Sequence, residues 1–172
     1  FRYYNYTAGT GNDEFTINSV NVYPAKAVTY GFTKIDGKYV SSNQGVNNTE
    51  SLIYLPVDLT KNFGEYNIKV NAQVSSVSGD YGLVNVLEEI GGTENQICYM
   101  YGEKSATEYT IKVNGGKMYY LRLRYYKDAK TSGGTDTFTV NSIDISPVLP
   151  VQEGKTDENG QLKLRAPYGK YK

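Results

Sequence analysis

The chain has 172 residues, of which 39% are hydrophobic and 21% are charged, a composition typical of a globular protein long enough to bury a core. Its 18 basic and 18 acidic residues balance, and the absence of a basic stripe argues against nucleic acid and membrane as partners. The chain contains no histidine, which excludes histidine-dependent catalytic triads and most zinc sites. No apolar run in the sequence approaches the roughly 20 residues that a membrane span requires.

The first half of the chain predicts short strands separated by turns. Residues 28–40 have the pattern of a hairpin, in which Asp36-Gly37 supplies a type I′ turn. Residues 52–59 are an apolar run, and Pro56 places that run at a sheet edge or a strand end, because proline donates no hydrogen bond to a ladder. Residues 66–74 alternate apolar and polar side chains, which indicates a strand with one buried face.

The second half continues the same pattern. Residues 81–87 and 97–101 are two further predicted strands, joined by an acidic segment that contains glycine. Residues 109–113 and 119–125 alternate apolar and polar side chains on either side of Gly115-Gly116. This arrangement predicts a two-residue hairpin with one apolar face on each strand.

The last predicted strand changes parity part-way along its length. Phe138 and Val140 point to one face, but Ile143 and Ile145 fall on the opposite parity, so we expect a β-bulge at Asn141-Ser142 that returns both pairs to the same face. No window has helical periodicity, and the sequence therefore predicts an all-β fold, an antiparallel β-sandwich of jelly-roll or Greek-key type with about seven or eight strands. We expect its core to include Ile68, Val70, Leu121, Leu123, Phe138 and Val140.

Part of the sequence occurs twice. Residues 2–24 align with residues 124–147 when one residue is inserted in the loop, and ten positions are then identical: Arg-Tyr-Tyr, one Gly, one Asp, Phe-Thr, Asn-Ser and the final Pro. The parity change recurs as well, which predicts a second bulge at Asn18-Ser19. We infer a module of about 120 residues arranged in tandem. Residues 1–24 would be the last strands of a preceding copy, or strands that complete the sandwich, and residues 25–147 would be one complete β-sandwich module.

The remaining residues, 148–172, are predicted to form a linker and a β-hairpin with an Asn159-Gly160 turn. Their phrase TDENGQLKLRAPYGKY resembles the start of a Cna B-type or prealbumin-like domain, a family of stalk modules in Gram-positive adhesins and pilins. The phrases GGKMYYLRLRYYKD and GGTDTFTVNSIDI resemble tandem β-sandwich repeat modules of Clostridia-like Firmicutes cell-surface proteins. These resemblances imply an extracellular location at the bacterial cell surface.

The tyrosines, 18 in number, are the chemically suggestive residues. Tyr120, Arg122, Arg124 and Tyr126 fall on the outward face of one predicted strand, where their rings and guanidinium groups could stack on sugar rings and donate hydrogen bonds to them. Alternatively, the same side chains form a cross-strand ladder that stabilises the sheet by about 0.2–1 kcal/mol per pair. The absence of tryptophan favours the ladder.

Other residues that could carry chemistry have simpler structural interpretations. Glu88-Glu89 could only form a glycosidase pair if both faced one site, and adjacent strand residues point to opposite faces. The glycine doublets lack the spacing of phosphate-binding loops and indicate turns. Residues 157–160 offer oxygen ligands for calcium, but Asx-rich hairpin turns have the same composition. Cys98 lies in an apolar run and is expected to be buried as a small hydrophobic residue.

We therefore expect a non-enzymatic module that needs no cofactor and no metal. Its expected role is structural or adhesive, within a secreted or wall-attached bacterial surface protein. Its partners would be neighbouring repeat modules of the same chain and a host or cell-wall glycan or protein. The alternative is a carbohydrate-binding module attached to a larger extracellular enzyme.

Overall fold

The computed structural model describes residues 29–130, 132–149 and 156–161. The expectations for residues 1–24, with the bulge at Asn18-Ser19, lie outside the described residues. Within the described residues there is no helix, and hence none that could cross a membrane. The ten described strands are β1 (Thr29–Tyr30), β2 (Phe32–Ile35), β3 (Lys38–Ser41), β4 (Thr49–Asp58), β5 (Glu65–Ser75), β6 (Tyr81–Leu87), β7 (Asn95–Tyr101), β8 (Lys104–Asn114), β9 (Met118–Lys127) and β10 (Thr137–Pro147).

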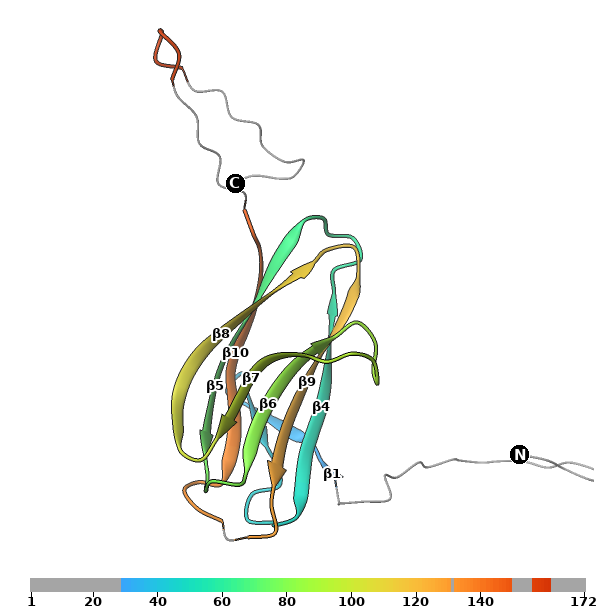
Figure 1. Cartoon of the computed structure of the whole chain (residues 1–172), viewed down its shortest axis with the longest axis vertical. Helices are drawn as coiled ribbons and strands as arrows, with labels where there is room; N and C mark the ends of the chain where they lie inside the picture. The colour runs from blue at the N-terminus through green and yellow to red at the C-terminus, as the bar shows by residue number, and fades with distance from the viewer. Residues whose placement is uncertain (1–28, 131, 150–155, 162–172) are drawn as a thin grey trace, which may run out of the picture.

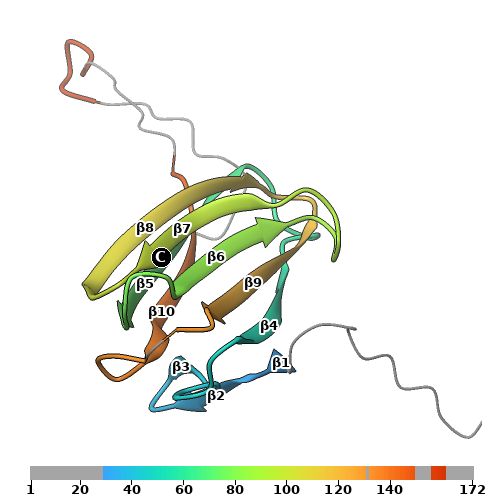
Figure 2. The ribbon, with the colours of Figure 1, turned by 60° about the horizontal axis from the view of Figure 1, so that its bottom comes forward.

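The strands form two five-stranded sheets packed face to face (Figure 1). Sheet A has the order β1-β4-β9-β6-β7, and sheet B has the order β2-β3-β10-β5-β8. From β3 to β10 the chain crosses between the sheets so that β3-β10-β5-β8 faces β4-β9-β6-β7, which is the strand order of a jelly roll. The predicted all-β sandwich is confirmed. The two short strands β1 and β2, with β3, lie together at one end of the molecule (Figure 2).

The core lies between the sheets and contains the residues that the alternation predicted. In β5, Ile68 and Val70 are fully buried because every second side chain faces sheet A. The ring of Phe138 stacks on Tyr125, with ring centroids 6.5 Å apart. All six predicted core residues are confirmed as buried: Ile68, Val70, Leu121, Leu123, Phe138 and Val140.

Three local predictions are also confirmed. Asp36 and Gly37 connect β2 to β3 with φ angles of 49° and 80°, as a type I′ turn requires. The register between β10 and β5 shifts between Val140 and Ser142, which is the expected bulge. Pro56 lies in β4 beyond the two residues that β1 pairs with, so only β9 bonds to the strand there.

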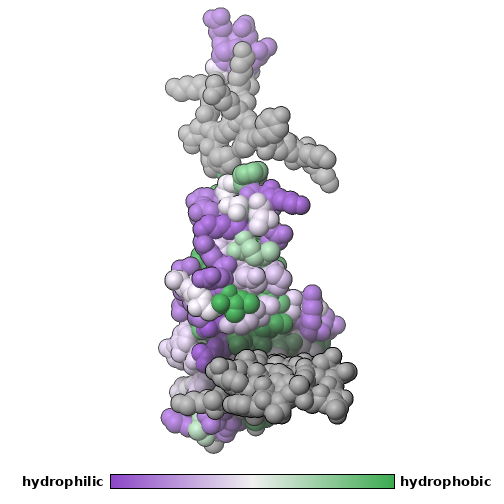
Figure 3. All heavy atoms as spheres, turned by 90° about the vertical axis from the view of Figure 1, so that its right-hand side faces the viewer, coloured by the Kyte–Doolittle hydropathy of each residue, from purple (hydrophilic) through white to green (hydrophobic). Residues whose placement is uncertain are grey.

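On the side of the molecule where β4 forms the edge, apolar side chains gather in one area at mid-height (Figure 3).

The predicted hairpin at Gly115-Gly116 is wrong. β8 pairs with β5 in sheet B, whereas β9 pairs with β4 and β6 in sheet A, so the glycines carry the chain from one sheet to the other. Their amide groups donate to the β4–β5 connection, from Gly115 to the Gly64 carbonyl (2.7 Å) and from Gly116 to the Leu59 carbonyl (2.8 Å). The contact is close, because a Cβ on Gly115 would lie 2.4 Å from the Asn62 carbonyl oxygen.

Candidate functional site

The outer surface of sheet A carries a group of aromatic side chains from three neighbouring strands. In the register of the sheet, Tyr81 of β6 lies between Tyr101 of β7 and Tyr126 of β9. Tyr99 lies two residues from Tyr101 on the same face of β7, and Arg124 lies two residues from Tyr126 on the same face of β9. We call these five side chains, Tyr81, Tyr99, Tyr101, Tyr126 and Arg124, the tyrosine face.

The rings of the tyrosine face form one continuous cluster. The centroid of Tyr81 is 5.2 Å from that of Tyr126, with the rings stacked, and 5.1 Å from that of Tyr99. Tyr99 and Tyr101 follow at 6.0 Å. The Arg124 guanidinium lies 5.7 Å from the Tyr81 ring and 5.6 Å from the Tyr126 ring, within the range of a cation–π interaction. These contacts join the four rings and the guanidinium group into one cluster on the outer surface of sheet A.

Exposure increases along the cluster toward the edge of the sheet. Tyr81 and Tyr126 are half-buried, whereas Tyr99 is 46% exposed and Tyr101 is 54% exposed. An open pocket of about 250 Å³ lies beside these two rings and is lined by Ser78, Gly79, Tyr99 and Tyr101. The tyrosine face therefore offers two accessible rings next to a concave surface at the β7 edge.

Carboxylates neutralise the arginines of this sheet. Glu50 on β4 accepts a hydrogen bond from Nε of Arg124 at 2.6 Å, and both side chains are largely buried. Glu94, from the connection between β6 and β7, pairs with Arg122 and also accepts a 2.5 Å hydrogen bond from the Asn85 amide. Asn85 Oδ1 and Arg122 Nε are the two buried side-chain atoms without a hydrogen-bond partner in the described part of the chain. The outer face of sheet A thus has aromatic surface with little net charge.

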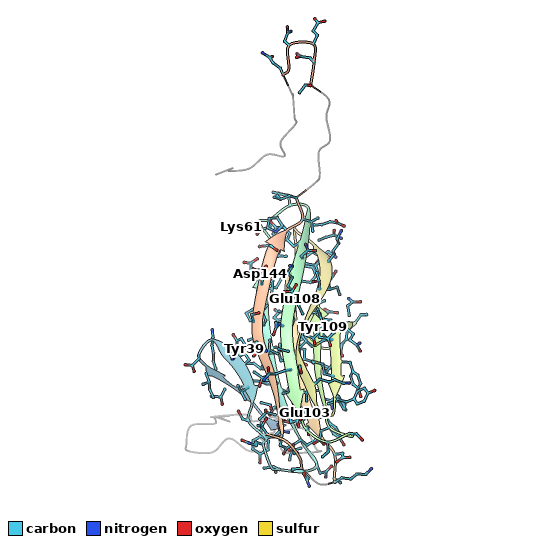
Figure 4. The ribbon with its side chains drawn as sticks, turned by 90° about the vertical axis from the view of Figure 1, so that its left-hand side faces the viewer. Tyr39, Lys61, Glu103, Glu108, Tyr109 and Asp144 are labelled. Atoms are coloured by element: carbon cyan, nitrogen blue, oxygen red, sulfur yellow. The ribbon has the colours of Figure 1, made fainter. Side chains whose placement is uncertain are left out.

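The outer face of sheet B differs in composition. Its β5 side chains are Asn67, Lys69, Asn71 and Gln73, which alternate with the buried residues of that strand. Figure 4 views the molecule from the side of sheet B, where Glu108 and Asp144 are labelled on β8 and β10. Lys69 and Glu108 form an exposed ion pair at 3.3 Å. This face resembles an ordinary solvated sheet surface, and aromatic side chains favour the other face as the candidate binding surface.

Comparison with known proteins gives weak structural likenesses. No protein-family model matches the chain, and no curated protein matches it. Among solved structures, TmCBM61 in complex with β-1,4-galactotriose is 11% identical, with a TM-score of 0.35 over 63% of this chain and 66% of that chain. A CBM4 structure is 9% identical, with a TM-score of 0.37 over 68% of this chain and 75% of that chain.

A third similar structure contains the CBM22-1 and GH10 modules of endo-1,4-β-D-xylanase 10B from Clostridium thermocellum, complexed with xylohexaose. It is 16% identical, with a TM-score of 0.33 over 69% of this chain, and this chain spans 27% of its length. At such identities and TM-scores these likenesses assign neither a ligand nor a binding face to the present chain.

The four residues proposed from the sequence, Tyr120, Arg122, Arg124 and Tyr126, all lie on the outward side of β9, in the interior of sheet A. All four are half-buried. The structure brings Arg124 and Tyr126 into one cluster with the accessible tyrosines of β7, whereas Arg122 forms an ion pair with Glu94. The binding role of these four residues stays a prediction.

Sequence reasoning missed Tyr81, Tyr99 and Tyr101. The signal that could have found Tyr99 and Tyr101 is the alternation at the end of β7. There the two tyrosines alternate with Cys98 and Met100, and the structure buries Cys98 and Met100. An apolar residue that is buried on one parity implies that the tyrosines of the other parity face outward. Nothing in the sequence placed Tyr81 beside them, because that neighbour comes from strand pairing.

The remaining candidate residues have structural roles. Glu88 is exposed and pairs with Lys117 at 2.6 Å. Asp157 accepts hydrogen bonds from the amides of Asn159 and Gln161, an Asx turn, and the described residues contain no acidic, cysteine or histidine cluster that could hold a metal ion. Cys98 is confirmed as buried, and burial raises the pKa of its thiol to about 11.

Proposed function

We propose that this chain is a carbohydrate-binding module and that a glycan binds on the tyrosine face of sheet A. The observation that supports this proposal is the pair of half-exposed rings, Tyr99 and Tyr101, which border a concave surface and are held by a cluster of further rings. This is the carbohydrate-binding role that the sequence left as the alternative, at a position shifted toward the β7 edge.

The chemistry of the surface matches a sugar better than other ligands. A pyranose has one face of C–H groups and a rim of hydroxyls, so it is best bound by an aromatic ring with polar groups nearby. Tyrosine supplies an apolar ring and a hydroxyl on the same side chain. Ser78 adds a further polar side chain at the pocket. The binding surface needs no reacting group, and its role is to hold a glycan.

The charges of the face favour a neutral glycan. Arg124 is paired with Glu50, and Arg122 is paired with Glu94, so neither guanidinium is a free partner for an acidic sugar. Binding an anionic group at Arg124 would require Glu50 to leave a partly buried ion pair, which is costly. We therefore expect neutral oligosaccharides to bind more tightly than glycans rich in uronic or sialic acid.

The test is a glycan array probed with the complete 172-residue chain, followed by calorimetry with the best neutral oligosaccharide. Tyr99→Ala and Tyr101→Ala should each weaken binding by about tenfold or more, which is about 1.4 kcal/mol. Their melting temperatures should change little, because both rings are about half exposed in the folded protein. Phe63→Ala is the matched control, since Phe63 is an 89% exposed aromatic residue on the β4–β5 connection.

Two outcomes would refute the proposal. The first is that no glycan binds at all. The second is that a glycan binds with an affinity that neither tyrosine substitution changes. If Tyr120→Ala abolished binding while Tyr99→Ala and Tyr101→Ala did not, the site would lie at the middle of β9 instead, which is the glycan-binding alternative to the ladder that the sequence favoured.

A structural or adhesive repeat module is the second candidate, and one observation favours it. Residues 2–24 repeat residues 124–147 closely, as neighbouring modules of a tandem array would. Such an array, like a glycan-binding module, would operate outside the cell, and we place the protein there in either case. A chain that bound no glycan but associated with its own neighbouring modules would support this second role.

A further inference from the structure

The edge of sheet B at β8 is long and open. β8 is the last strand of that sheet, at the left-hand margin of the molecule in Figure 1, and β5 is its single partner among the described residues. It has 11 residues, whereas the other strands at sheet edges, β1, β2 and β7, have 2, 4 and 7. The outer side of β8 therefore offers a row of backbone amides and carbonyls to which another extended strand can bond.

The common devices that block an edge are largely missing from β8. Edge strands avoid pairing when they are short, when a proline or a bulge interrupts them, or when a charged side chain points inward. β8 contains no proline, and residues 107–114 pair with β5 without a bulge. Its charged residues in this stretch, Glu108 and Lys112, are exposed, whereas Tyr109 and Ile111 of the other parity pack against the core.

The charges of this stretch are complementary to a second copy of itself. Glu108 lies two residues before Thr110, Lys112 lies two residues after it, and all three side chains point outward. When two β8 strands pair antiparallel with Thr110 opposite Thr110, each Glu108 lies opposite the Lys112 of the other copy. Centring the pair on Glu108 or on Lys112 instead places like charges opposite each other, which is destabilising. Among registers that keep the outward side chains on one face, the one centred on Thr110 alone gives both charges an opposite partner.

The inward parity matches in the same register. Tyr109 of each copy then lies opposite Ile111 of the other, which is an aromatic and β-branched pair of the kind that stabilises antiparallel strands. Both side chains are only partly buried in the single chain, although they pack against its core. Pairing would therefore cover apolar surface that one copy leaves accessible at its edge.

The ion pairs already present on sheet B would extend across the junction. Glu108 pairs with Lys69 at 3.3 Å, and Lys112 pairs with Glu65 at 3.4 Å, in both cases with a neighbour on β5. In the register centred on Thr110, a row of alternating charges would run from Lys69 and Glu108 of one copy to Lys112 and Glu65 of the other. Each charge of the row then has only opposite charges beside it.

We propose that two copies of this chain associate by antiparallel pairing of their β8 strands about Thr110, so that the two B sheets become one continuous sheet. A second copy is the partner that fits, because β8 is complementary to itself and a two-fold axis brings the same patch of both copies together. The surface buried by a single pair of edge strands is small, so we expect a concentration-dependent dimer with a Kd between about 1 μM and about 1 mM.

The dimer would have a consequence for the tyrosine face. The two-fold axis runs perpendicular to the joined sheet, so sheet A of both copies lies on the same side of it. Both tyrosine faces would then meet one glycan-bearing surface and bind it with avidity. This consequence rests on the proposed glycan-binding function, whereas the association of the two chains does not.

The test is sedimentation equilibrium of the complete chain, without glycan, at concentrations up to about 1 mM. Glu108→Lys and Lys112→Glu should each weaken the dimer by about tenfold or more, because each creates two pairs of like charges. The chain that carries both substitutions should dimerise as the native chain does. An equimolar mixture of the two single variants should form a heterodimer in which every pair is again opposite, and this rescue also shows that both variants fold. Lys117→Glu is the control, because it makes the same charge change in an exposed 2.6 Å ion pair with Glu88 outside β8.

The register has a separate test. Only the residue on the two-fold axis lies opposite its own copy, so Thr110→Cys should form a disulfide-linked dimer under mild oxidation. Asn114→Cys is the control, because the two copies of Asn114 would lie about 27 Å apart along the strands at about 3.4 Å per residue. The native Cys98 is buried and should not take part.

Three results would overturn the proposal. The first is a chain that stays monomeric up to about 1 mM, including one whose β8 amides resist hydrogen exchange because another segment of the same chain covers them. The second is a dimer whose Kd neither charge reversal changes, which would place the contact on another surface. The third is a mixture of the two single variants that associates no better than either variant alone.

Discussion

Gly82 is a sensitive position of the core, and its substitution tests the packing between the sheets. A Cβ atom there would lie 2.1 Å from Cδ2, 2.4 Å from Cγ and 2.5 Å from Cε2 of Phe138. The Phe138 ring cannot easily withdraw, because it is fully buried between Tyr125 and Phe32, whose ring centroids are 6.5 Å and 6.3 Å away. Gly82 therefore allows an aromatic ring of one sheet to lie on the backbone of the other.

We expect Gly82→Ala to lower the free energy of unfolding. Overpacking of this kind costs about 1–3 kcal/mol, and the loss of unfolded-state freedom from a Gly→Ala change returns only about 0.4–1 kcal/mol. The net loss should be about 1–2 kcal/mol in urea denaturation, with an unchanged m-value. Gly31→Ala is the control, since a Cβ at Gly31 meets nothing within 4 Å, and this variant should be as stable as the native chain or slightly more so.

A double-mutant cycle with Phe138→Leu decides whether the ring is the cause. Leucine removes the ring atoms that the new Cβ would meet, so Gly82→Ala should cost less in that background. We expect a favourable coupling of about 0.5–3 kcal/mol between the two sites. Additivity within about 0.5 kcal/mol, or a Gly82→Ala chain as stable as the native one, would refute the packing that we describe.

Three further outcomes follow from burial and charge. Leu121→Ala should cost about 2–5 kcal/mol in urea denaturation, whereas Leu149→Ala, at a 71% exposed site, should change stability by no more than about 0.5 kcal/mol. The Cys98 thiol should resist alkylation in the folded chain and react once denaturant is added. Burial raises its pKa from 9.0 to about 11, so folding keeps the thiol protonated. Its contribution to the free energy of unfolding is therefore fully present below pH 9 and is lost as the pH rises through 11. Lys112→Ala should cost less than about 1 kcal/mol, because the Glu65 pair is exposed.

Much of the fold could be predicted because its signals are local. The alternation in β5 depends only on the extended backbone, which sends successive side chains to opposite faces. The bulge between Val140 and Ser142 could be predicted for the same reason, since one extra residue is the cheapest way to return Ile143 and Ile145 to the core. The buried faces of single strands can thus be read from sequence without knowledge of their neighbours.

The partner of each strand could not be predicted in the same way. Gly115-Gly116 looks like a hairpin turn because a hairpin and a crossing between two sheets both require the chain to reverse direction. What separates them is whether the next strand bonds to the same sheet, and the amides of both glycines are used by the β4–β5 connection, more than 50 residues earlier in the chain. Whether the chain forms a hairpin or crosses to the other sheet is decided by long-range packing, and no local sequence pattern indicates which of the two occurs.

The candidate site illustrates the same limit on a functional surface. The parity of β9 placed Arg124 and Tyr126 outward, but a binding surface on a sheet runs across strands, and its other members come from β6 and β7. The ring of Tyr81 reaches Tyr126 because the two residues are paired in the ladder, at a separation of 45 residues in the sequence. A glycan could contact Tyr101, Tyr81 and Tyr126 together only because the strand order of sheet A places these residues side by side. In a sheet with another order, the same tyrosines would form no common surface.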